Sequence, residues 1–173
     1  MKKLMAVLLV MVMVLSMAAC GAKKSGASLE GTMEENVTKI MEAVPVEFMG
    51  GLIPLDLTDT SEDGLWALKS FTGLDSADSI TDIAVYEPMT GSQAFSLVMV
   101  RVAEGADAQE VAQQMKDNID PRKWICVGAD EVMAAGYGDT VMFIMLSSDL
   151  KLSAQSYVDA FAEICGGKVD FTI

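Results

Sequence analysis

The chain has 173 residues, 51% hydrophobic and 21% charged, which fits one domain of ordinary size. All 25 acidic residues follow Cys20 but only 10 of the 12 basic ones do, so the part from Cys20 onward carries a net charge of −15. Such a charge argues against binding nucleic acid and against docking on anionic lipid through a basic face. Histidine is absent, which excludes Ser-His-Asp and Cys-His catalytic arrangements and the usual zinc sites.

Residues 1–19 have the three parts of a secretory signal peptide. Lys2 and Lys3 give a positive start, an apolar run follows, and Ala18 and Ala19 precede Cys20. The apolar run is short for a membrane span, which needs about 20 apolar residues.

Residues 17–20, Met-Ala-Ala-Cys, resemble the lipobox of bacterial lipoproteins. The resemblance implies that a diacylglyceryl group is attached to the sulfur of Cys20 and that cleavage makes Cys20 the new N-terminus. The thiol is needed because its thiolate is the nucleophile. Two acyl chains would anchor the protein stably on the outer face of the cytoplasmic membrane of a Gram-positive-type bacterium. The alternatives are an ordinary cleaved signal with a chance cysteine and an uncleaved anchor.

The small and polar residues after Cys20 predict a flexible tether over 20–31, followed by a single domain over 32–173. Thr32 and Glu35 form a capping-box pattern before an amphipathic helix that ends at Pro45. Residues 44–58 are apolar but broken by glycine and proline, which predicts an irregular or short-strand connection.

A second helix is expected from Ser61 to Thr72, with Ser61 or Asp59 as its cap and Gly73 as its terminator. The pattern then changes to two strands, 80–87 and 94–103, joined by a longer loop.

A third helix is expected from Asp107 to Ile119. A second, tight hairpin follows, with strands 132–137 and 140–147 on either side of a Gly-Asp turn. Its second strand is apolar on both faces and is therefore expected to be buried on both sides. The last helix runs from Ser153 to Cys165, and residues 168–173 are consistent with a short edge strand.

The order ααββαββα predicts an α+β fold, an antiparallel sheet from two β-hairpins with helices packed mainly on one face. Three stretches, SFTGLDSADSITDIAVYEP, FSLVMVRVAEGADAQEVAQQM and AAGYGDTVMFIML, resemble a family of small lipoproteins from Gram-positive anaerobes that carry a domain of unknown function. The resemblance covers residues 32–166. It implies an architecture and a location, but neither an activity nor catalytic residues.

Residues 59–64, Asp-Thr-Ser-Glu-Asp-Gly, match the opening of a calcium-binding loop. Ser70 stands where the loop needs a bidentate acid, so an acidic helix N-terminus is the preferred interpretation. Cys126 and Cys165 are the two thiols outside the lipobox. They form either a disulfide that closes a loop of about 40 residues or two separate thiols that act as small hydrophobic groups.

Nine methionines follow Cys20, and thioethers can bind copper(I). They are scattered, and Met115, Met142 and Met145 fall at expected core positions, so core filling is the preferred interpretation. Two groups of acids could serve acid–base catalysis but are interpreted as a solvated face: Asp56, Asp59, Glu62 and Asp63, and Asp75, Asp78 and Asp82. No metal or other cofactor is expected.

Residues 48–55 are apolar without a helical or strand period. They are interpreted either as a connection over the core or as a mobile contact surface for a protein or small-molecule partner, formed by Phe48, Met49, Leu52, Ile53 and Leu55. We therefore expect a lipid-anchored, non-catalytic binding module. The alternatives are a histidine-free carboxylate-dependent hydrolase of envelope polymers and a structural envelope protein.

Overall fold

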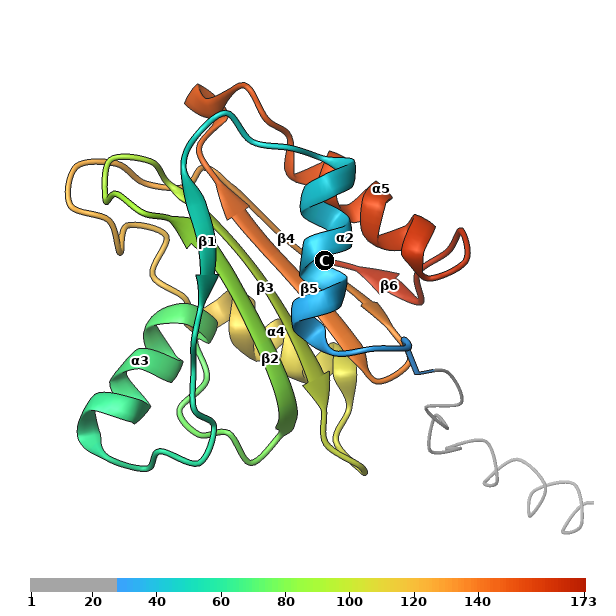
Figure 1. Ribbon diagram of the computed structural model, residues 1–173. Coiled ribbons are helices and arrows are strands. Elements are labelled where there is room, and N and C mark those ends of the chain that lie inside the picture. Colours follow the sequence, from blue (N-terminus) through green and yellow to red (C-terminus); the bar gives the residue numbers. More distant parts are fainter. Residues whose placement is uncertain (1–27) are drawn as a thin grey trace, which may run out of the picture.

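The computed structural model describes residues 28–173, which form an α+β fold with four α-helices and an open antiparallel sheet of six strands (Figure 1). The elements in chain order are α2 (Met33–Ala43), β1 (Gly50–Ile53), α3 (Glu62–Thr72), β2 (Ile80–Pro88), β3 (Phe95–Val102), α4 (Ala108–Asn118), β4 (Glu131–Tyr137), β5 (Thr140–Leu146), the 3₁₀ helix η1 (Ser148–Leu150), α5 (Ala154–Ile164) and β6 (Phe171–Thr172).

Local hydrogen bonds set the helix boundaries where the sequence predicts them. The N–H of Glu35 donates to the Thr32 hydroxyl while the Glu35 carboxylate accepts from the N–H of Thr32, which completes the capping box of α2. The hydroxyl of Ser61 caps α3, and Gly73 ends that helix with a φ of 76°. A left-handed φ of this kind costs glycine little, which explains its place at the helix end.

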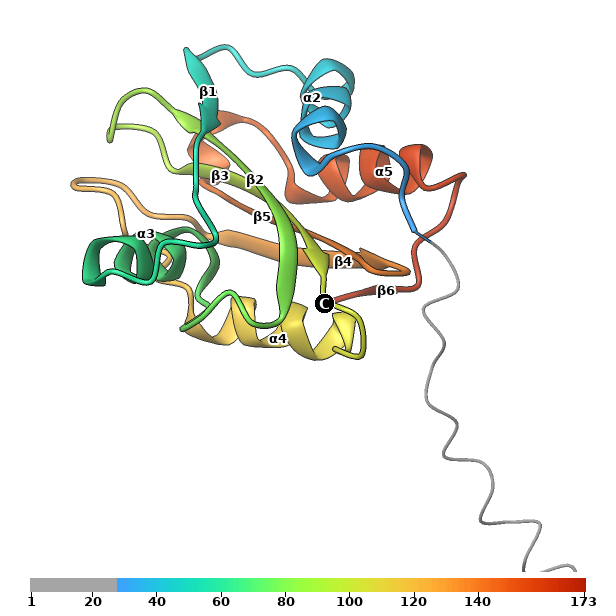
Figure 2. The same cartoon turned by 60° about the horizontal axis from the view of Figure 1, so that its bottom comes forward.

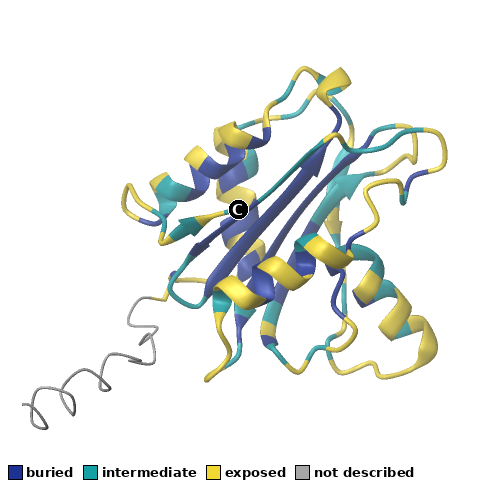
Figure 3. Ribbon diagram, turned by 180° about the vertical axis from the view of Figure 1, so that it is seen from behind, coloured by how far each residue is buried: buried dark blue, intermediate teal, exposed yellow. Residues whose placement is uncertain are grey.

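The strand order in the sheet is β1-β2-β3-β5-β4-β6. The central strands β3 and β5 are almost completely buried, and every residue of β5 is buried (Figure 3). The expectation that residues 140–147 include a strand buried on both sides is therefore confirmed. The edges of the sheet are β1, which is a short strand within the 44–58 connection, and the two-residue strand β6.

Helices cover both faces of the sheet: α2 and α5 lie on one face, and α3 and α4 lie on the other (Figure 2). Alternate residues of the central strands enter two separate hydrophobic clusters, for example Leu97 and Ile144 under α2 and α5, and Val98 and Phe143 over α4. The expectation that the helices pack mainly on one face is therefore wrong. Both faces of β3 and β5 are apolar, so each needs a covering layer.

Candidate functional site

The segment that precedes α2 is held at one end of the sheet by Arg101 of β3. The Arg101 guanidinium donates to the carbonyl oxygens of Leu29 (2.8 Å) and Gly31 (2.9 Å), and it forms an ion pair with Asp139 (3.1 Å) in the β4–β5 turn. Leu29 is buried in the hydrophobic cluster beneath α2. Residues 28–31, which we expected within the tether, therefore contact the domain.

Exposed apolar side chains lie at the opposite end of the sheet. Met49 precedes β1 and Met89 follows β2, and the N–H of Met89 donates to the carbonyl oxygen of Met49 (2.9 Å). Ile125, in the loop after α4, is 91% exposed, and its Cδ1 lies 3.9 Å from the position that a Cβ would take on Gly91 of the β2–β3 loop. We call Met49, Met89 and Ile125 the distal patch.

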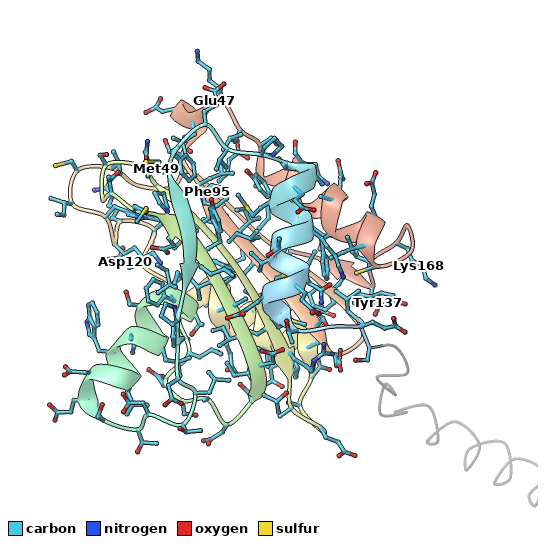
Figure 4. All side chains as sticks on the ribbon, viewed as in Figure 1. Glu47, Met49, Phe95, Asp120, Tyr137 and Lys168 are labelled. Atoms are coloured by element: carbon cyan, nitrogen blue, oxygen red, sulfur yellow. The ribbon has the colours of Figure 1, made fainter. Side chains whose placement is uncertain are left out.

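The distal patch and the entry of the chain are separated by the length of a strand. Asp82, near the start of β2, accepts a hydrogen bond from the first N–H of α2, whereas Met89 follows the other end of that strand. At about 3.3 Å per residue these two positions lie about 23 Å apart. Figure 4 shows Met49 and Tyr137 at the two ends of the sheet.

Residues 48–55, interpreted either as a connection over the core or as a mobile contact surface, contain the edge strand β1. The side chain of Phe48 packs against the core beneath α2, while Ile53 and Leu55 pack against the core on the other face. Met49 and Leu52 are 78% and 40% exposed. The structure thus narrows the candidate contact residues of this segment to Met49 and Leu52.

A buried ion pair is formed by two residues that lie close in sequence to members of the distal patch. Lys123, two residues before Ile125, pairs with Glu87 of β2, and their side chains are only 10% and 12% exposed. The Lys123 ammonium also donates to the carbonyl oxygen of Ser70 (3.2 Å) and to the hydroxyl of Ser96 (3.5 Å). It lies 4.6 Å from the centre of the Phe71 ring, an arrangement that allows a cation–π attraction.

Burial lowers the pKa of Lys123, and the attraction of Glu87 opposes that shift. A lysine with a lowered pKa can act as a nucleophile or a base. Here its three donors meet three acceptors on α3, β2 and β3, which fits a structural cross-link better than a catalytic group. Sequence reasoning missed this pair because nothing local signals that a loop lysine reaches a distant strand.

Cys126 and Cys165 are both free thiols. Cys126 is exposed in the loop after α4, between residues that pack on the α3–α4 face, whereas Cys165 is buried in the cluster on the α2–α5 face. The sheet therefore lies between them, and the disulfide alternative is not formed. Burial raises the pKa of the Cys165 thiol to about 12.

The Asp59–Gly64 segment is a helix start: Asp59 accepts from the N–H of Ser61, and α3 begins one residue later. Hydrogen bonds from Ser61 lower the pKa of Asp59. In residues 28–173 no group of three or more acidic or cysteine side chains is placed to hold a metal ion. The preferred interpretation as an acidic N-terminus agrees with this geometry.

Three more acids of the two groups considered for catalysis have separate local partners. Asp56 accepts from Thr58, Asp75 pairs with exposed Lys69, and Asp78 accepts from the Ser76 hydroxyl. Met115, Met142 and Met145 are fully buried, which confirms their expected positions in the core.

Cys20 lies outside the described residues, so the lipid attachment stays a prediction. Within residues 28–173, no helix combines the length and the apolar character that crossing a membrane requires. Comparison of the chain with protein-family models, curated proteins and solved structures found no match.

Proposed function

We propose that the chain is a lipoprotein anchored through Cys20 to the outer face of the cytoplasmic membrane, and that its domain is a non-catalytic module that binds a partner protein at the distal patch. The observation that carries this proposal is that the N-terminal segment and the distal patch lie at opposite ends of the sheet. The N-terminal segment enters at the Arg101 end, and exposed Met49, Met89 and Ile125 lie at the other. An anchored domain with this geometry offers an apolar surface away from its tether, and exposed apolar side chains of this kind favour protein contacts.

A photo-cross-linking experiment on the full chain in its own membrane tests the proposal. A photoreactive amino acid replaces either Met89, just beyond the end of β2, or exposed Thr81, near the start of the same strand. We expect light-dependent adducts with another protein at position 89 and none at position 81. The proposal fails if position 89 gives no adduct, or if both positions give the same adducts in equal yield.

A further inference from the structure

The outer edge of β1 carries backbone groups without a partner in the described structure. In an antiparallel pair, every second residue directs its N–H and C=O away from the neighbouring strand. The hydrogen bond from Met89 to Met49 sets this alternation, so Gly50 and Leu52 direct their backbone groups outward. Pro88, opposite Gly50, has no N–H to offer, which agrees with this assignment. No hydrogen bond from elsewhere in residues 28–173 reaches the outward groups.

The two glycines of β1 differ in what their surroundings require. A Cβ on Gly50 would lie 2.7 Å from the Tyr86 ring, so this position needs glycine. A Cβ on Gly51 would meet nothing within 4 Å, and Gly51 has no positive φ. The fold itself therefore does not explain Gly51. A Cβ at this position would stand over a face of the sheet, where it meets only open space, so Gly51 does not obstruct a strand that pairs in the plane of the sheet.

The acidic residues around β1 favour a basic segment as the strand that pairs with its outer edge. Residues 40–68 contain six acidic residues and neither lysine nor arginine, and Glu47 and Asp56 stand on either side of β1. A second copy of the chain would bring one acidic flank against another, which costs free energy. A basic extended segment would instead place lysine or arginine near these carboxylates. Exposed Leu52 and Met49, on opposite faces of the strand, offer it apolar neighbours.

We infer that β1 is a strand-addition site that takes a basic, extended segment of the partner protein as a further strand of the sheet. The inference deepens the proposed function and rests on it. Hydrogen bonds to the backbone of Gly50 and Leu52 supply affinity, and the acidic flanks supply selectivity.

A peptide-binding experiment on the full-length lipidated protein in nonionic detergent tests the inference. The probe is a synthetic peptide that alternates valine and lysine, and its matched control carries glutamate in place of lysine. We expect the lysine peptide to bind, the glutamate peptide not to bind, and the bound peptide to slow hydrogen exchange at the amides of Gly50 and Leu52. Equal binding of both peptides, or unchanged exchange at these amides, would overturn the inference.

Two substitutions of Leu52 distinguish the contribution of its backbone N–H to peptide binding from that of its side chain. Leu52→Pro removes the outward N–H without removing a bond to β2, and proline is tolerated on sheet edges. We expect Leu52→Pro to weaken peptide binding about tenfold, and Leu52→Ala, which keeps the N–H, to change it by less than about threefold. Equal affinities of the two variants would contradict strand addition.

The Glu47→Lys variant and cross-linking at position 89 provide two further tests of the inference. Glu47→Lys leaves the backbone of β1 unaltered and should weaken binding of the lysine peptide, so its failure to do so would contradict the charge argument even if Leu52→Pro does not fold. Cross-linking at position 89 distinguishes the two proposals. If adducts persist in a folded Leu52→Pro variant, the interaction module stands and strand addition is wrong.

Discussion

At the scale of single residues, adjacent Gly50 and Gly51 have different surroundings, and this difference gives a matched test. Gly50→Ala would push a Cβ against the Tyr86 ring and the backbone oxygen of Glu87, 2.9 Å away. We expect a loss of about 1–3 kcal/mol in the free energy of unfolding. Gly51→Ala meets open space and restricts the unfolded chain, so it should be neutral or stabilising by up to about 1 kcal/mol. Urea unfolding of the two variants checks this, and equal losses would contradict the surroundings described for β1.

The buried side chain of Lys123 leads to a prediction about how the free energy of unfolding depends on pH. Because burial lowers its pKa in the folded state below the ordinary value of 10.5, the unfolded chain binds more protons between the folded-state pKa and 10.5. Stability contributed by this group therefore rises with pH across that window, and it is independent of pH below the folded-state pKa, where both states are protonated.

The reference for this measurement is the double variant Glu87→Gln, Lys123→Met, which removes the titrating lysine without leaving a buried carboxylate unpaired. Urea unfolding at a series of alkaline pH values up to 10.5 should show the wild type gaining stability relative to this variant as the pH rises above the folded-state pKa of Lys123. If the difference in unfolding free energy stays constant or falls as the pH rises, the Lys123 side chain is not buried as the structure shows.

These residues also show what a single sequence reveals. The caps at Thr32 and Ser61 were predictable because each hydrogen bond closes within three residues. The Lys123–Glu87 pair was not, because its partners come from a loop and a strand far apart in the chain. Local chemistry can be read directly from the sequence, whereas a contact of this kind depends on the whole topology.

At the scale of elements, both hairpins and all four described helices were predictable from their periods and caps. The placement of the helices was not. The strand at residues 140–147 is apolar on both faces, which predicts two covering layers, but no period in a helix indicates which face of a sheet it will cover. The sequence allowed a short strand within residues 44–58 but did not show which residues form β1, since the glycines and prolines of this segment obscure a strand of four residues.

The apolar residues in β1 and just before it carry an element-scale prediction, because they differ in burial. Phe48 and Ile53 pack against the two cores, so replacing both with serine should lower the free energy of unfolding by about 2–4 kcal/mol. Replacing Met49 and Leu52 with serine should change it by less than about 0.5 kcal/mol each, since both are exposed. Chemical unfolding compares the pairs. If the first pair costs no more than the second, β1 does not pack as described.

At the scale of the whole molecule, the account depends on an anchor at one end and a contact surface at the other. Cys20→Ala should abolish lipid attachment, and the protein should then remain as an uncleaved or miscleaved precursor. Mass spectrometry of the purified chain checks this outcome. A variant whose mature mass equals that of the wild type would show that the lipobox interpretation is wrong.

The most direct measurement of the central claim is the hydrogen-exchange rate of the Leu52 amide, compared between the lipidated protein in its own membrane and the same protein purified in detergent. If a partner adds a strand at β1, the Leu52 amide should exchange slowly in the membrane and rapidly after purification. The amide of Val98, in the buried centre of the sheet, should exchange slowly in both samples. Rapid exchange at Leu52 in both samples would contradict the account.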